Sequence, residues 1–411
     1  MPVRSNMKNA LLDNRIMALR EAHQEAGIKR AELDLSGGID SAVMAGVLVL
    51  ALGPENVTLV HSRFATNPAQ SDRARRLAEG LDCPLIDVGL GAMWEVLMGD
   101  MVDALVNAHA DAIGSAHDAE RLGYAIDYRD VVISERAPAA LTQFMEPCEG
   151  GFKTQVPVFP DPSDKAAVKT FLRGALLARC EANPTILGSI RSCLRAPIGR
   201  GFNRLTGGGI RHGTGNECED RWLRFYQKGG DGEVDSNPIA MLSKGEVYQL
   251  AWMLMKRLPQ AAEAFRDTIL ATPSPDLWGT GDAHTDEAEL KTWLGVPFTY
   301  SRIDIETGEY SHVGSIERVS RFLDVQSWGA HPISDYLFGV YEPDWPEMTI
   351  EAKDSGLFVG FTSQEITDFL KAARRAEKIT RHKMNPNIPT YGTREELVRK
   401  GILTNNLPTI G

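Results

Sequence analysis

The segment SGGIDS at residues 36–41 carries the strongest structural signal in the sequence. A short run containing apolar residues, 31–35, precedes it and a long apolar run starts at Ala42, so the pattern predicts a strand, a glycine turn and a helix start. The first backbone N–H groups of a helix have no internal partner, and the helix dipole adds positive potential there. Because two glycines allow close backbone approach, we predict that this turn binds phosphate.

Asp40 lies inside this turn, where an acid would repel phosphate unless a divalent cation such as Mg²⁺ bridges the two. The segment is not a Walker loop, because the lysine and spacing of G-x-x-x-x-G-K-[ST] are missing. The order S-G-G-x-D-S instead resembles the pyrophosphate-binding loop of the N-type ATP pyrophosphatases. These enzymes cleave ATP to AMP and pyrophosphate while they activate a carboxyl or carbonyl oxygen. Without that likeness, the same residues would be interpreted as an ordinary surface turn.

Composition narrows the possible functions. The chain has 411 residues, 43% hydrophobic and 24% charged, which is enough for one large core or two medium ones. Its net charge of −11 argues against a nucleic-acid-binding surface, and no apolar run approaches the roughly 20 residues that span a membrane. No signal-peptide pattern is present, so we expect a cytoplasmic protein. The five cysteines lack C-x-x-C spacing, which favours reduced thiols over disulfides or a zinc site.

Helix and strand patterns alternate over the first ninety residues. We expect helices up to Ala26, from Ser41 and over 71–81, and strands over 32–35, 57–61 and 84–88. This order predicts an α/β fold, a Rossmann-like doubly wound parallel sheet whose ligands bind at the carboxyl ends of the strands. The segment SGGIDS lies at such an end.

Two long segments interrupt the pattern. We expect one insertion at about 95–185, with a long helical pattern over 93–119 and a proline- and glycine-rich loop or lid over 147–162. A second insertion, 305–362, is rich in aromatic residues. The expected organisation is a domain over 1–304 interrupted by the first insertion, then the second insertion, and a C-terminal segment, 363–411, that returns to the substrate site.

A second group of motifs begins after residue 209. It contains Gly213-Thr214 with Glu219, Lys228 with Asp231, the run VDSNP at 234–238, Ser243 with Lys244 and Glu246, Pro273-Ser274, TDE at 285–287, and His382-Lys383. Ser243 and Glu246 have the spacing of a capping box, which predicts a helix start at Ser243. Each of the other motifs is individually weak.

Together, and in this order, the motifs resemble those of the ammonia-dependent NAD⁺ synthetase family, whose fold is of the adenine nucleotide alpha-hydrolase type. The resemblance covers about 1–95, 186–304 and 365–390. It implies a two-step ligase reaction that uses ATP, deamido-NAD⁺ and ammonia. The nicotinate carboxylate attacks the α-phosphorus, pyrophosphate leaves, and ammonia then displaces AMP to give NAD⁺.

The resemblance also implies roles for individual residues. Asp40 and Glu219 match Mg²⁺ ligands. The positions matching ATP-binding residues are Ser36, Gly37, Gly38, Ile39, Asp40, Ser41, Thr214, Lys244 and Ser274. Asp40, Lys244 and Asp231 are the expected catalytic residues. The expected deamido-NAD⁺-binding residues are Arg191, Arg195, Lys228, Asp235, His382 and Lys383. We expect His212 and His284, which lie beside motifs, to be structural.

Most departures from the family pattern fall at positions that match residues binding the deamido-NAD⁺ substrate. Cys193 stands where the family has an arginine, so Arg191 or Arg195 would replace it, and His61 occupies another arginine position. A related adenylating amide synthase acting on nicotinate mononucleotide or another carboxylate therefore stays open, as does a nucleotide-binding regulator without turnover. Only 35 residues precede the loop. Free ammonia, or a separate glutaminase, is then the expected nitrogen source. The family also implies a homodimer.

Overall fold

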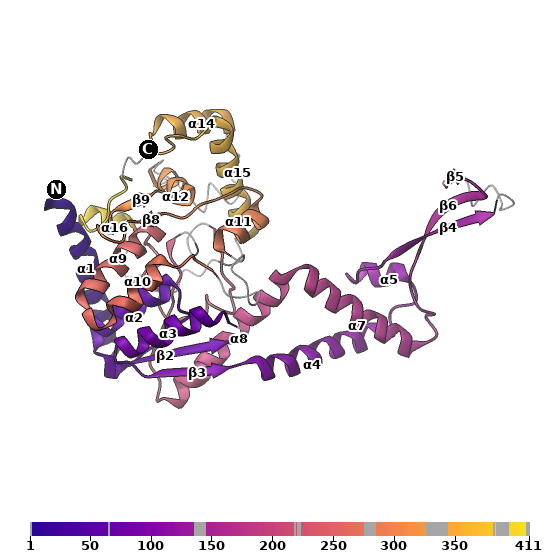
Figure 1. The fold of residues 1–411 in the computed structure, drawn as a ribbon, viewed down its shortest axis with the longest axis horizontal. Coiled ribbons are helices and arrows are strands. Elements are labelled where there is room, and N and C mark those ends of the chain that lie inside the picture. Colours follow the sequence, from indigo (N-terminus) through magenta and orange to yellow (C-terminus); the bar gives the residue numbers. More distant parts are fainter. Residues whose placement is uncertain are drawn as a thin grey trace. The chain divides into compact units, whose positions relative to one another are not determined.

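The computed structural model describes residues 2–64, 66–134, 145–217, 219, 223–274, 285–325, 344–380, 383 and 394–407. These residues form two compact units, one comprising 1–89 with 189–411 and the other 90–188 (Figure 1). No helix in the described parts of the chain is both long enough and apolar enough to cross a membrane.

A four-stranded parallel sheet is the centre of the first unit. Its strands are β1 (Ala31–Asp34), β2 (Val57–Arg63), β3 (Leu85–Gly89) and β7 (Ile210–His212), and they lie in the order β3-β2-β1-β7. The expected α/β fold with a parallel sheet is confirmed. Because β2 and β7 pair with opposite edges of β1, the strand order reverses at β1, and ligands of such sheets bind at this reversal, outside the carboxyl ends of the strands.

Helices pack on this sheet through a large apolar core. Helix α2 (Ile39–Leu52) is buried along most of its length and packs against α1 (Pro2–Ala26) and α9 (Lys244–Arg257). At Gly46 a side chain would collide with Leu254 and Phe265, so the glycine permits close approach of α2 to α9 and α10 (Ala262–Leu270). Helix α3 (Pro68–Gly80) follows β2, and proline at its first position suits a helix start.

The remaining elements of this unit surround the sheet or form a second apolar cluster. They are η1 (Pro54–Asn56), α8 (Pro184–Leu205), η3 (Pro259–Ala261), α11 (Asp286–Leu294), β8 (Arg302–Ile303), β9 (Tyr310–His312), α12 (Ser315–Val325), α14 (Trp345–Asp354), α15 (Ser363–Thr380) and α16 (Arg394–Arg399). Residues of α11, α12, α14 and α15 share the second cluster, whereas Leu397 of α16 joins the core beneath the sheet.

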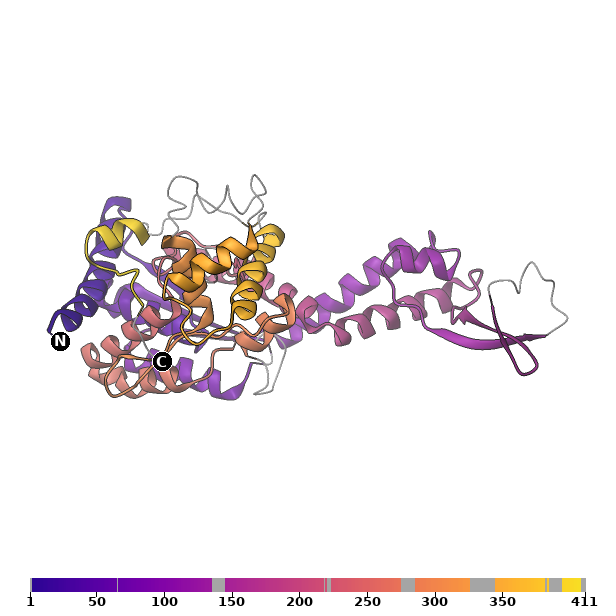
Figure 2. The same ribbon diagram turned by 90° about the horizontal axis from the view of Figure 1, so that it is seen from above.

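The second unit contains α4 (Gly91–Ala110), α5 (Ala116–Arg121), β4 (Tyr128–Ser134), β5 (Glu146–Cys148), β6 (Gly151–Pro157) and α7 (Lys165–Ala182) (Figure 2). The long helical pattern expected over 93–119 is divided, because α4 ends at Ala110 and α5 begins at Ala116. Strands β5 and β6 occupy much of the segment expected as a loop or lid. Pro147 lies on an edge strand, since the sheet order is β4-β6-β5, and Gly150 and Gly151 turn the chain with positive φ.

Two neutral histidines, His23 of α1 and His212 of β7, are joined by a hydrogen bond. Nδ1 of His23 is 2.8 Å from the carbonyl oxygen of Ile28, so this nitrogen carries the proton and donates it. His212 must then donate through Nε2 to Nε2 of His23, 3.0 Å away, and accept at Nδ1 from the hydroxyl of Ser236, 2.7 Å away. His212 is buried and hydrogen-bonded within the fold, whereas His284 lies outside the described residues.

The pair of His23 and His212 predicts that the folded protein loses stability in acid. Burial, aided by His23, lowers the pKa of His212 to about 3, and burial also lowers the pKa of His23. Below pH 6.5 the unfolded chain therefore binds protons that the folded chain refuses, so stability falls as the pH decreases toward 3. His212 alone should remove about 2 kcal/mol between pH 6.5 and 5. Urea unfolding at both pH values should show a smaller pH difference for His212→Gln than for the parent chain; an equal difference would contradict this.

Candidate functional site

The phosphate-binding loop predicted from the sequence joins β1 to α2. The hydroxyl of Ser41 donates to the carbonyl of Gly38 at 3.1 Å, and the hydroxyls of Ser36 and Ser41 are 3.0 Å apart. Gly37 has φ +84°, and a side chain there would collide with the carbonyl of Gln70, so this position requires glycine. Gly38, the N-cap of α2, supplies no side-chain cap, which leaves the first N–H groups of the helix available to an anion.

Three predicted site residues meet at this loop. Nζ of Lys244 is 2.7 Å from Oδ2 of Asp40 and 3.2 Å from Oε1 of Glu219. The lysine is buried, while both carboxylates keep about a fifth of their side-chain surface exposed, at 17% and 19%. Asn216 also belongs to this group, because its amide donates to Oδ1 of Asp40 at 3.2 Å. The turns after β1 and β7 therefore meet where the strand order reverses.

The electrostatics of Lys244 follow from these neighbours. Burial would lower the pKa of the ammonium group, but the carboxylates of Asp40, Glu219 and Asp286 outweigh burial and hold this pKa well above its usual value. The ring centre of Tyr300 lies 5.1 Å from Nζ and adds a cation–π contact. The lysine is thus a fixed positive charge beside the phosphate-binding loop.

A capping box positions Lys244 at the first residue of α9. The backbone N–H of Ser243 donates to Oε2 of Glu246 at 2.8 Å, and the N–H of Glu246 donates back to the hydroxyl of Ser243 at 3.3 Å. The helix start predicted from this spacing is confirmed. Arg394 clamps the carboxylate of Glu246 through two contacts of 2.9 and 3.1 Å.

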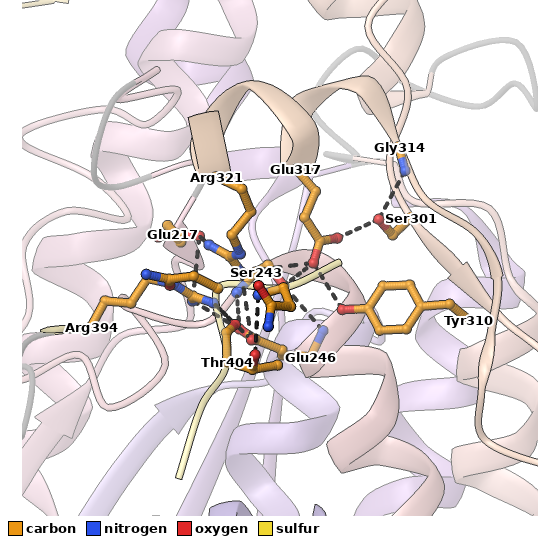
Figure 3. A network of polar contacts seen from close by, with 12 residues as sticks. Glu217, Ser243, Glu246, Ser301, Tyr310, Gly314, Glu317, Arg321, Arg394 and Thr404 are labelled. Atoms are coloured by element: carbon orange, nitrogen blue, oxygen red, sulfur yellow. Dashed lines mark hydrogen bonds and ion pairs between the residues drawn. The ribbon is translucent and has the colours of Figure 1, made fainter. Parts of the chain in front are cut away.

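Glu246 belongs to a larger buried network (Figure 3). Arg321 pairs with Glu217 at 2.9 Å, and Arg394 approaches the same glutamate at 3.7 Å. Glu317 accepts from the hydroxyls of Ser243, Ser301 and Tyr310. The network joins α9, α12 and α16 immediately behind Lys244, and nothing in the sequence pattern had indicated it.

Asp231 and Lys383 lie in a second group. Asp231 accepts from the hydroxyl of Ser192, and Nζ of Lys383 donates to the carbonyls of Arg224 at 3.1 Å and Tyr226 at 2.5 Å. Burial lowers the pKa of Lys383, and the charge of Asp231 partly opposes this effect. These contacts hold Lys383 against the segment that precedes Asp231.

Asp235 makes different contacts. Its carboxylate accepts from Arg200 at 2.8 Å and from the backbone N–H of Arg211 at 2.9 Å. Arg211 is itself buried against Glu32, at 2.5 Å, and against Asp34. Asp235 therefore lies beside the end of β7 that carries the site.

Arg195 lies near the phosphate-binding loop. It shares a small cavity with Ser36 and His61, and its guanidinium carbon is 5.7 Å from the ring centre of Phe64. His61, at a position where the family has arginine, bonds the carbonyl of Leu35 at 2.8 Å and the hydroxyl of Ser71 at 3.0 Å. Arg195 can therefore reach a ligand held beside Ser36.

For the other predicted residues the structure gives the position and the degree of burial. Thr214 is half-buried after β7, Ser274 is half-buried after α10, Lys228 is exposed and Arg191 is half-buried on α8. His382 lies outside the described residues. Asn216 and Tyr300 were missed by sequence reasoning; Asn216 follows Gly213-Thr214 directly, which could have indicated it, whereas no local pattern marks Tyr300.

A family model described as NAD synthase matches residues 11–128 and 185–308. The chain belongs to the NAD synthase family. It is similar to the NH₃-dependent NAD⁺ synthetase of Carboxydothermus hydrogenoformans, at 27% identity over 315 residues, covering 76% of this chain and 90% of that protein. The corresponding protein of Methanosarcina acetivorans is 28% identical over 281 residues, covering 67% and 75%.

Among solved structures, NMN synthetase from Francisella tularensis aligns with a TM-score of 0.47 and 15% identity, covering 93% of this chain and 99% of that chain. As a member of its family, the protein is an ATP-dependent ligase that forms carbon–nitrogen bonds.

Proposed function

We propose that this protein adenylates the nicotinate carboxylate of deamido-NAD⁺ and aminates it with ammonia, giving NAD⁺, AMP and pyrophosphate. The observation that supports the proposal best is the meeting of Lys244, Asp40 and Glu219 beside the phosphate-binding loop. One fixed cation and two partly exposed carboxylates at a helix N-terminus suit a triphosphate carried with a divalent cation.

In the first step a carboxylate oxygen of the substrate attacks the α-phosphorus of ATP, and the bond to pyrophosphate breaks. This displacement mainly needs alignment and neutralisation of charge. The N-terminus of α2 holds the departing pyrophosphate, and Lys244 balances negative charge as it develops. In the second step ammonia attacks the acyl carbon, AMP leaves with the electron pair, and the nitrogen loses a proton.

Mg²⁺ fits the residues present. Asp40 and Glu219 both approach Nζ of Lys244, so their oxygens lie near one another, and both side chains keep access to solvent. Carboxylate oxygens are preferred Mg²⁺ ligands, and they would be joined by phosphate oxygens and water. When bound, the ion would neutralise phosphate charge. Among the described residues no group of three or more His, Cys, Asp or Glu side chains is arranged to hold a metal ion.

The residues that bind the acceptor, deamido-NAD⁺, are also part of this proposal. Lys228, Asp235, Lys383 and His382 would bind deamido-NAD⁺ with Arg191 and Arg195, and Asp231 would act with Lys244 in catalysis. Arg195 shares a cavity with Ser36 of the phosphate-binding loop, which favours a contact with ATP over one with deamido-NAD⁺. We further propose the domain limits expected from the sequence, with the C-terminal segment closing the substrate site, and a cytoplasmic homodimer.

Pyrophosphate release from Mg-ATP and ammonium tests the function, with deamido-NAD⁺, nicotinate mononucleotide or no acceptor and products identified by mass. We expect release only with deamido-NAD⁺, together with stoichiometric AMP and NAD⁺. Release only with nicotinate mononucleotide would keep the chemistry and change the substrate. No release with any acceptor would contradict the proposal.

The cation requirement gives a separate prediction. Asp40→Asn and Glu219→Gln each remove one negative charge from the proposed ligand pair, so the Mg²⁺ concentration for half-maximal pyrophosphate release should rise at least roughly tenfold. Asp13→Asn, which alters an exposed carboxylate paired with Arg257, is the matched control and should leave the requirement unchanged. An unchanged Mg²⁺ titration for both site variants would remove these carboxylates from the metal site.

A further inference from the structure

Two serines of helix α8 bind the segment that carries Asp231. Ser189 and Ser192 are three residues apart, so their side chains lie on one side of the helix. The hydroxyl of Ser192 donates to Oδ1 of Asp231, and the hydroxyl of Ser189 accepts from the side-chain amide of Gln227 at 2.9 Å. Helix α8 therefore holds both ends of the segment 227–231 through side chains that are one turn apart.

The segment 227–231 is a tight turn that lies directly against α8. The backbone N–H of Gly230 donates to the carbonyl of Gln227 at 2.9 Å. A side chain at Gly230 would collide with the hydroxyl and the backbone of Ser192, so the turn can approach the helix only because this residue is glycine. This close approach brings the carboxylate of Asp231 within reach of the short side chain of Ser192.

The two partners of this hydrogen bond differ in exposure. Ser192 is buried, whereas Asp231 is exposed and can be reached by a substrate. An exposed carboxylate ordinarily samples several side-chain conformations, and a hydrogen bond to a donor fixed in the fold restricts this sampling. Ser192 therefore orients the carboxylate of Asp231 by holding its Oδ1 against α8.

The charge of Asp231 acts on two other parts of the candidate site. Burial raises the pKa of Asp34, and the charge of Asp231 contributes to this increase. Asp34 ends β1, two residues before Ser36 at the start of the phosphate-binding loop. The same charge opposes the effect of burial on the pKa of Lys383. The carboxylate that Ser192 orients is therefore close enough to interact with groups on both the ATP side and the acceptor side.

We propose that Ser192 is a positioning residue for the amination step, because its hydrogen bond orients Asp231 toward the attacking nitrogen. The inference rests on the proposed function, in which Asp231 acts in catalysis. At neutral pH ammonia is present mainly as ammonium, which has no lone pair with which to attack. Asp231 accepts one proton from ammonium, the freed lone pair forms the bond to the acyl carbon, and AMP leaves with the electrons of the broken C–O bond. Water takes the second proton.

The transfer of the first proton depends on orientation. The donor nitrogen and the accepting oxygen must lie about 3 Å apart, and a carboxylate that turns away loses this geometry. Adenylation needs no such transfer, because the nicotinate is already a carboxylate when it attacks the α-phosphorus. Loss of the Ser192 hydroxyl should therefore slow the second step and leave the first step unchanged.

The test compares Ser192→Ala with Ser189→Ala in the full chain. Ser189→Ala is the matched control, because it removes a hydroxyl that holds the same turn through Gln227 rather than through Asp231. Exchange of labelled pyrophosphate into ATP, with deamido-NAD⁺ but without ammonia, reports adenylation alone. Amination is measured with ammonia and, separately, with hydroxylamine, which is mostly unprotonated at neutral pH and needs no base before it attacks. Mass spectrometry identifies NAD⁺ or the hydroxamate, and circular dichroism verifies the fold.

We expect the parent chain and both variants to exchange pyrophosphate at the same rate. Ser192→Ala should react with ammonia about 10- to 100-fold more slowly than the parent chain, but with hydroxylamine within about threefold of the parent rate. Ser189→Ala should keep both amination rates within about threefold.

Three results would overturn the inference: an ammonia rate of Ser192→Ala equal to that of the parent, equal losses with the two nucleophiles, or the same loss in Ser189→Ala. Slower pyrophosphate exchange by Ser192→Ala would also overturn it, because the hydroxyl would then support the whole site. An absence of exchange by the parent chain is a different failure, since it would refute the proposed function and the inference with it.

Discussion

Replacing Lys244 by methionine is expected to lower kcat/KM for pyrophosphate release by at least about 10²- to 10³-fold, the range found when one preorganised stabiliser of transition-state charge is removed. Methionine keeps much of the buried volume but supplies no charge beside the phosphates. The carboxylates of Asp40 and Glu219 are partly exposed, so water and cations screen them once the lysine is gone, and the fold should survive.

Lys256→Met is the control for this variant. Lys256 lies in the last turn of the same helix with its ammonium over the ring of Trp252, and its loss should leave turnover unchanged. Pyrophosphate measured in samples quenched at set times gives the rates, and circular dichroism confirms that both variants fold. Turnover of Lys244→Met within tenfold of the parent rate would place the reacting phosphates elsewhere.

Arg394→Met is expected to produce the largest loss of stability, about 3–5 kcal/mol, because it leaves two buried carboxylates, Glu217 and Glu246, to share the guanidinium of Arg321. Glu246 would lose two contacts of 2.9 and 3.1 Å, and Glu217 would lose its second arginine. Burial raises the pKa of Glu246, but Arg394 and Arg321 hold it below its usual value in the intact protein. Urea unfolding at neutral pH measures the change.

Arg399→Met, on the same helix but exposed, should change stability by less than about 0.5 kcal/mol. Adding Glu246→Gln to Arg394→Met removes one uncompensated charge and should recover part of the loss. If Arg394→Met unfolds at the same urea concentration as Arg399→Met, the network does not stabilise the protein.

Local patterns predicted the central sheet and the start of α9. Strands β1, β2 and β3 lie within a few residues of the expected ranges, because buried parallel strands between glycine turns and helices leave a clear hydrophobic pattern. Ser243 and Glu246 predicted a helix start through a contact that spans only three residues. Such features depend on neighbours in the sequence, which is why they could be predicted.

Features built from distant residues could not be predicted in this way. The capping box gave no sign that Glu246 also binds Arg394, 148 residues further along the chain. Pro147 and the glycine pair predict a loop or lid over 147–162, but β5 and β6 occupy much of this segment, and β6 pairs with β4 on the far side of residues 135–144. The three residues that meet at the phosphate-binding loop were linked only through the family resemblance.

The clamp of Arg394 on Glu246 constrains when the protein can become active during its synthesis. A ribosome releases the phosphate-binding loop and α9 long before it adds residue 394, so Glu246 first emerges without the arginine that holds it. Until then Glu217 and Glu246, beside the start of the helix that carries Lys244, share the guanidinium of Arg321, and the nascent chain should bind ATP weakly. The contacts that hold Glu246 are therefore completed only after residue 394 has left the ribosome.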